Sequence, residues 1–225
     1  QYNNGAWSQL GSDIDGEARD DNSGISVSIS DDGTKVAIGA NENDGNGGNS
    51  GHTRIYQYIS GAWIQLGNDI DGETATNYSG IAVSMNNDGT RVAIGAYLNS
   101  GNGSYSGHTR VFKYSEGSWN QLGSDIDGEA AYHYAGIAVS MSDNGSKIAI
   151  GNNVGSVNVY EFIAPPKINS VSLTSNNTNI TVTTDSNVYN TNGASGDLEA
   201  TDFIFSISGG DAALSSSTPT SIFKT

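Results

Sequence analysis

The chain repeats itself every 56 residues, and this period restricts its fold more than any other feature. The segment GAWSQLGSDIDGE at residues 5–17 returns at 61–73 as GAWIQLGNDIDGE, and at 117–129 as GSWNQLGSDIDGE. The motif Val-Ala-Ile-Gly at residues 36–39 recurs with the same shift as VAIG and IAIG. The chain is therefore built from tandem copies of one structural unit.

Each repeat shows the pattern of four short strands. Residues 25–29 alternate apolar and small polar side chains, as a half-buried strand does. Residues 31–34 read Asp-Asp-Gly-Thr and predict a tight hairpin turn in which the glycine takes a positive φ. Residues 35–40 form a nearly continuous apolar strand that we expect to be buried on both faces. Residues 53–58 and 62–66 supply the third and fourth strands.

Four-stranded antiparallel units at this period predict an all-β fold, a partial β-propeller of three blades. Other β arrays fit less well, because solenoid coils repeat at roughly 20–30 residues. Helical repeats would show a period of about 3.6 residues, which the sequence lacks. Residues 1–7 match residues 57–63, so we expect the chain to open inside the third strand of a blade. Closed propellers have about four to eight blades, so we expect a fragment of a longer propeller.

The third repeat departs from the pattern, and the repeat ends after it. Three residues separate Gly151 from Gly155, where eleven separate Gly39 from Gly51. No tryptophan-bearing fourth strand follows Phe162. These features predict propeller repeats over residues 1–163, a proline-containing linker over 164–168 and an incomplete β-sandwich over 169–225. Strands are expected at 169–174, 179–184 and 202–208.

The repeats resemble the FG-GAP family, which is related to the propeller of integrin α-subunits. The resemblance is carried by Gln9-Leu10-Gly11, Ser23-Gly24, Val36-Ala37-Ile38-Gly39-Ala40, and the Asn/Asp/Gly loop that closes on Gly51. The segments Ser170-Val171-Ser172-Leu173 and Ile180-Thr181-Val182 resemble the start of an Ig-like module of bacterial surface proteins. Together these resemblances imply an extracellular or cell-surface adhesion protein.

The calcium site of integrin-type blades lies between the first and second strands, and we do not transfer it to this chain. The connection there is only the four-residue turn 31–34, 87–90 or 143–146. Calcium takes six to eight oxygen ligands from a loop long enough to surround the ion. A tight turn does not supply them.

The acidic connector DIDGE is the other candidate for a cation, calcium included. The spacing of a calcium loop is incomplete, so a turn is the favoured interpretation, in which Asp caps its own backbone and Gly takes a positive φ. A weak metal site remains as the alternative. Its candidate ligands are Asp13, Asp15, Glu17, Asp69, Asp71, Glu73, Asp125, Asp127 and Glu129. The loop 41–47 has an acid-free counterpart at 97–103, and we expect a flexible solvated loop there.

Neither zinc nor catalytic chemistry is predicted. His52 and His108 occupy the same repeat position, and His133 stands in a connector, but no Cys or second His accompanies them. We expect structural or surface histidines. The chain has no cysteine, no nucleophile elbow and no glycine-rich phosphate loop ahead of a helix. We therefore expect no catalytic residue, no bound cofactor and no enzymatic activity. A count of 24 acidic and 9 basic residues argues against a nucleic-acid partner.

Strand directions place the acidic connectors and the long Asn/Gly loops at one end of the blades, where we expect ligands to bind. The sequence thus predicts a non-catalytic, extracellular or cell-surface recognition module for a protein or carbohydrate ligand. One alternative is the non-catalytic part of a larger secreted enzyme. Another is an intracellular WD40-like scaffold, since Ser30-Asp31-Asp32-Gly33 before an apolar strand also occurs in such blades. No apolar run is long enough to span a membrane.

Overall fold

The computed structural model describes residues 2–3, 5–163, 168–173 and 180–184. The chain divides into two compact units, residues 1–162 and 163–225. All regular structure in the described residues is β, in antiparallel sheets of which none closes into a barrel. No helix in this part of the chain has the length and apolarity to cross a membrane.

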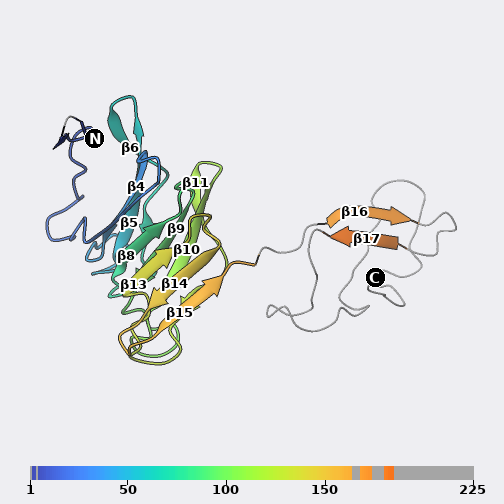
Figure 1. Cartoon of the computed structure of the whole chain (residues 1–225). Helices are drawn as coiled ribbons and strands as arrows, with labels where there is room; N and C mark the ends of the chain where they lie inside the picture. Colours follow the sequence, from blue (N-terminus) through green and yellow to red (C-terminus); the bar gives the residue numbers. More distant parts are fainter. Residues whose placement is uncertain (1, 4, 164–167, 174–179, 185–225) are drawn as a thin grey trace. The chain divides into compact units, whose positions relative to one another are not determined.

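The first unit holds three successive sheets, preceded by the hairpin β1 (Tyr2–Asn3) and β2 (Ala6–Trp7) (Figure 1). The strands of the first sheet, in spatial order, are β3 (Ser26–Ile29), β4 (Lys35–Ala40), β5 (His52–Ile59) and β6 (Ala62–Gln65). Those of the second are β8 (Ser79–Met85), β9 (Arg91–Ala96), β10 (His108–Ser115) and β11 (Ser118–Gln121). Those of the third are β13 (Ala138–Met141), β14 (Lys147–Gly151) and β15 (Val157–Glu161).

The strands expected in the first repeat match β3 to β6 within one residue at either end. The turn between β3 and β4 is tight because Asp32 holds it. Its Oδ1 accepts hydrogen bonds from Ser30 Oγ (2.7 Å), the Thr34 amide (2.9 Å) and Thr34 Oγ1 (2.8 Å). These bonds favour the carboxylate, led by the one from Ser30, and lower the pKa of Asp32 to about 2.

Each sheet packs face to face on the next, chiefly through its first two strands. The side chains buried between the first and second sheets include Ala37, Ile55, Val83, Met85, Val92, Ile94 and Phe112. Those between the second and third include Ala93, Val111, Ala135, Ile148 and Ile150. Serine side chains also hydrogen-bond across these sheet interfaces. Ser28 Oγ accepts from the Met85 amide and Ser84 Oγ from the Met141 amide, both at 2.9 Å.

The second unit contributes one described hairpin, β16 (Ile168–Leu173) and β17 (Ile180–Thr184). These strands lie where the first two strands of the expected sandwich were placed. The third expected strand, 202–208, and most of the expected linker, residues 164–167, lie outside the described residues.

Candidate functional site

The long loops and the connectors between sheets meet at one end of the first unit, which we call the acidic end. It comprises the loops 41–51 and 97–107 and the connectors 13–24, 69–79 and 125–136. The side chain of Asn46 donates to the Gly72 carbonyl, and Asn102 donates to Gly128, both at 2.8 Å. Each loop is thus fastened to the connector that leaves its own sheet.

The second and third connectors form short strands in place of the turns that we expected from the sequence. β7 (Ile70–Asp71) pairs with β5, placing Asp71 opposite His52, and β12 (Ile126–Asp127) pairs with β10 in the same way. Gly72 has a φ angle that is not positive. It is required for space, because a Cβ there would lie 2.0 Å from the Ser50 carbonyl oxygen. The expectation of a positive φ at this glycine was wrong.

Pairing of the connectors brings two identical groups of ionisable side chains together. Cluster 1 consists of Glu17, His52 and Asp69, and cluster 2 of their repeat equivalents Glu73, His108 and Asp125. In cluster 1, His52 Nδ1 lies 3.7 Å from Glu17 Oε2 and 3.7 Å from Asp69 Oδ2. In cluster 2, His108 Nδ1 lies 3.8 Å from Glu73 Oε2 and 3.6 Å from Asp125 Oδ2. Each cluster joins the connector entering a sheet, a strand of that sheet and the connector leaving it.

The carboxylates of each cluster are held by neighbouring polar groups. In cluster 1, the Gln65 side chain donates to Asp69 Oδ1 (2.5 Å), which is the oxygen turned away from His52. Arg54 lies with Nη1 3.8 Å from Glu17 Oε1, and its Nη2 donates to the Asp15 carbonyl (2.7 Å).

Cluster 2 repeats this arrangement. Gln121 donates to Asp125 Oδ1 at 2.7 Å, and Arg110 Nη1 lies 4.0 Å from Glu73 Oε1. Asn99 donates to Glu73 Oε2 at 3.3 Å, as Asn43 does to Glu17 at 3.5 Å. The side-chain geometry at this position is therefore common to the first two repeats.

The histidines are buried, with 2% of the His52 side chain and 1% of the His108 side chain exposed. Burial, followed by the charge of Arg110, lowers the pKa of His108 to about 4, and Asp125 opposes this shift. His108 is therefore neutral near pH 7. Its Nδ1 has no hydrogen-bond partner in the part of the chain that the structure describes.

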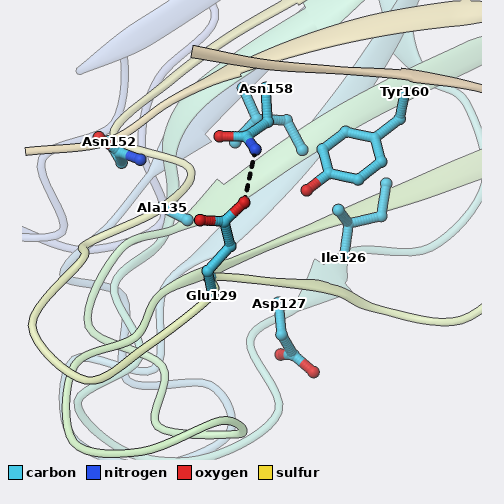
Figure 2. Close-up of a pocket in the computed structure, with 9 residues that line it drawn as sticks. Ile126, Asp127, Glu129, Ala135, Asn152, Asn158 and Tyr160 are labelled. Atoms are coloured by element: carbon cyan, nitrogen blue, oxygen red, sulfur yellow. Dashed lines mark hydrogen bonds between the residues drawn. The ribbon is translucent and has the colours of Figure 1, made fainter. Parts of the chain in front are cut away.

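The third sheet lacks the cluster. The register of β15 places Ser156 and Asn158 where His52 and Arg54 stand in the first sheet. Asn158 donates to Glu129 Oε1 at 2.9 Å, and Figure 2 shows these side chains pointing toward each other in a small pocket. Asp127 and Tyr160 also line this pocket (Figure 2).

Five tyrosines form a second feature of the acidic end, which we call the tyrosine cluster: Tyr78, Tyr97, Tyr105, Tyr132 and Tyr134. Successive ring centroids lie 5.9 to 6.3 Å apart in the order 78, 97, 134, 105, 132, and the rings of Tyr134 and Tyr105 are stacked. Tyr105 and Tyr132 are 42% and 57% exposed. Burial, followed by the neighbouring Tyr78, raises the pKa of Tyr97, so its hydroxyl stays protonated.

Four of these tyrosines, all but Tyr97, adopt a left-handed backbone with φ between 53° and 63°. In the first repeat the equivalent positions carry Asp20, Asn22 and Asn49, also at positive φ. Asn and Asp tolerate this conformation because their short side chains bond locally, whereas other L-residues lose about 1–2 kcal/mol there. The backbone thus keeps its left-handed conformation between repeats, while the residue changes from Asn or Asp, which tolerate this conformation, to Tyr, which does not favour it.

The nine acidic residues named from the sequence separate into three groups. Glu17, Asp69, Glu73 and Asp125 join the histidine clusters. Asp71 and Asp127 lie on β7 and β12, and burial, followed by Asp69 or Asp125, raises their pKa. Asp13, Asp15 and Glu129 belong to neither cluster, although Asp13 accepts from Gln9 at 2.8 Å as its counterparts accept from Gln65 and Gln121.

The structure adds detail to two expectations. Loop 41–47 is solvated at its tip, where Asp44, Gly45 and Asn46 are exposed, but its base is packed, since Asn41 and Asn43 are buried and Asn43 Oδ1 accepts from the Gly45 amide at 2.8 Å. His52 and His108 are buried, and the carboxylates beside them come from segments distant in the sequence, so their proximity could not be predicted from Cys and His spacing. The tyrosine cluster was also missed. Its signal was the replacement of Asn by Tyr at matching repeat positions.

No protein-family model matches the chain, and no curated protein matches it. Among solved structures, a Kuenenia stuttgartiensis hydrazine synthase chain aligns with a TM-score of 0.39 at 12% identity, over 60% of this chain and 44% of that one. A complex of KlAtg21 with the AgAtg16 coiled coil aligns with a TM-score of 0.44 at 12% identity, over 70% of this chain and 49% of that one. A putative 6-phosphogluconolactonase from Bacteroides uniformis aligns with a TM-score of 0.44 at 11% identity, over 70% of this chain and 46% of that one. This chain spans less than half of each of these proteins, and at such TM-scores the likenesses assign it no family and no function.

Proposed function

We propose that this chain belongs to an extracellular or cell-surface recognition protein that acts by binding rather than catalysis, and that its acidic end binds a carbohydrate. The three sheets are the blades of an FG-GAP-like propeller. The packing of successive sheets through their first two strands supports this, since blades converge on a central axis at their inner strands. The β16–β17 hairpin is the start of an Ig-like module.

The tyrosine cluster is the observation that carries the choice of ligand. Four tyrosines occupy left-handed positions at a local cost of about 1 kcal/mol or more each, where the first repeat uses Asp or Asn. Backbone strain that a fold retains tends to mark functional positions. Exposed rings of Tyr105 and Tyr132 offer flat apolar surface with a polar tip, which is how tyrosine serves at binding surfaces.

The surroundings of the tyrosines favour a sugar over other ligands. A surface hollow beside Tyr105 is lined by Glu73, Asn77, Asn99 and Ser100. Carboxylate and amide groups hydrogen-bond hydroxyl groups, while an aromatic ring packs against the apolar face of a sugar ring. The net charge of −15 disfavours anionic ligands such as nucleic acids.

The test is a glycan array, followed by calorimetry with the best glycan, on the chain and on the double variant Tyr105→Asn/Tyr132→Thr. The new residues are those of Asn49 and Thr76, which occupy these positions in earlier repeats at positive φ, so the backbone is preserved. We expect at least tenfold weaker binding. A matched control, Asp31→Lys/Asp143→Lys, alters exposed turns at the opposite end and should bind normally. Unchanged affinity in the tyrosine variant, or an array without a bound glycan, would overturn the proposal.

A further inference from the structure

We propose that clusters 1 and 2 are two divalent transition-metal sites of the zinc class, each using one histidine Nδ1 and one oxygen from each of two carboxylates. The ligands are His52, Glu17 and Asp69 in the first site, and His108, Glu73 and Asp125 in the second. This inference is independent of the proposed carbohydrate.

The donor set and its spacing fit such an ion. In each cluster the three ligand atoms lie within 4.8 Å of one another. Zinc bound tetrahedrally at about 2.0–2.1 Å holds its ligands about 3.4 Å apart. The histidine–carboxylate distances of 3.6 to 3.8 Å need to shorten by only a few tenths of an ångström. Imidazole combined with carboxylate favours transition metals over calcium, which takes oxygen ligands.

His108 provides an independent sign of a missing ligand. Its Nδ1 is buried and lacks a hydrogen-bond partner among the described residues, while it faces two carboxylate oxygens. At 3.6 and 3.8 Å from these oxygens, a protonated Nδ1 would be too distant for a good hydrogen bond. Buried polar atoms in native proteins are normally satisfied, and a cation between the three atoms would satisfy this one.

Neighbouring residues orient the carboxylates as partners of metal ligands do. Gln65 and Gln121 occupy the Oδ1 atoms of Asp69 and Asp125, leaving Oδ2 directed at the histidine. Arg54 and Arg110 lie near the Oε1 atoms of Glu17 and Glu73, whereas Oε2 faces the histidine.

The charge around each cluster also suits a divalent ion. The two proposed ligand carboxylates of cluster 1, those of Glu17 and Asp69, carry two negative charges when ionised, and one divalent cation neutralises them. Asp71 lies nearby, between the charges of His52 and Arg110. In the third sheet the histidine and the arginine have been replaced together, by Ser156 and Asn158. Loss of both residues at once is expected if they serve one site.

The experiment measures metal content and affinity on the whole chain. The protein is stripped with a chelator, dialysed against zinc and analysed by mass spectrometry for bound metal, with manganese and calcium in parallel. We expect two zinc ions per chain and a raised melting temperature. His52→Gln and His108→Gln should each lose one ion with at least a hundredfold weaker binding at that site, and the double variant should lose both. His133→Gln, outside both clusters, is the matched control and should retain two.

Cobalt substitution gives a second readout, since visible absorption bands of tetrahedral Co²⁺ should appear with two equivalents and disappear in the double variant. If a histidine variant fails to fold, Asp69→Asn and Asp125→Asn test the same sites through partly exposed ligands. Stoichiometry below one ion, retention of zinc by the double variant, or binding of calcium in preference to zinc would each overturn the inference.

Discussion

A single methyl group placed at Gly95 should separate the second and third sheets. A Cβ built there lies 1.9 Å from the Gly136 carbonyl oxygen and 2.8 Å from its carbonyl carbon. An ordinary carbon–oxygen contact is about 3.3 Å, so the sheets would have to move apart by about 1.4 Å. Both obstacles are backbone atoms, and no side-chain rotamer can relieve them. Overpacking costs about 1–3 kcal/mol, and we expect Gly95→Ala to reach the upper end, about 3 kcal/mol.

Gly151→Ala is the matched control, because Gly151 is the repeat equivalent in the third sheet. A Cβ there would lie 3.4 Å from its nearest neighbour, the Ala138 Cβ, which is ordinary contact. Its φ is not positive, so we expect a change of less than about 0.5 kcal/mol. Urea unfolding followed by tryptophan fluorescence gives both values. Trp119 reports the transition, because it packs against the side chains buried between the first and second sheets. A difference below about 1 kcal/mol between the two variants would refute the face-to-face packing described here.

Two further perturbations probe the histidine and tryptophan positions. Between pH 6.5 and about 4 the unfolded chain takes up a proton at His108 that the folded chain does not. In the presence of chelator, the unfolding free energy should therefore fall by up to about 3 kcal/mol as the pH is lowered through this range. This contribution to stability should be fully present above the range. His108→Gln should fall less steeply in urea titrations from pH 4 to 7.5, and parallel curves would contradict the shift. Trp119→Phe removes the indole bond to the Leu66 carbonyl (2.7 Å) and should destabilise by about 1–2 kcal/mol, as should Trp63→Phe, which loses its bond to Leu10 (2.8 Å). A decrease in unfolding free energy below about 0.5 kcal/mol in thermal or urea unfolding would show that these hydrogen bonds do not stabilise the connection between repeats.

Strand positions in the repeats could be predicted closely because each strand has its own local signal. The alternation of residues 25–29, the apolar run 35–40 and the turn between them are each visible in a short stretch of the sequence. β7 and β12 could not be found in this way, because a two-residue strand has no periodicity. They form where the chain passes the start of β5 or β10, and that proximity is a property of the whole sheet.

The histidine clusters were hidden for a related reason. Glu17, His52 and Asp69 are widely separated in sequence; the pairing of β7 with β5 brings Asp69 to His52, and Glu17 reaches them from the preceding connector, near Arg54 and Asn43. The clustering of the long loops and connectors at one end could be inferred from strand direction alone. Which individual side chains meet there depends on register, and register is fixed by packing across the whole repeat.

With the proposed ion bound, each histidine cluster would join the beginning and the end of a single repeat. Glu17 and Asp69 lie at the beginning and the end of a stretch of roughly fifty residues, which includes all four strands of one sheet, and His52 joins them. A contact that closes a loop of this length restricts the open chain much as a cross-link does. The first two repeats each contain this cluster, whereas the third has the Asn158–Glu129 hydrogen bond in its place. In a chain of near-identical modules, ion binding in two of the three would favour opening of the third first.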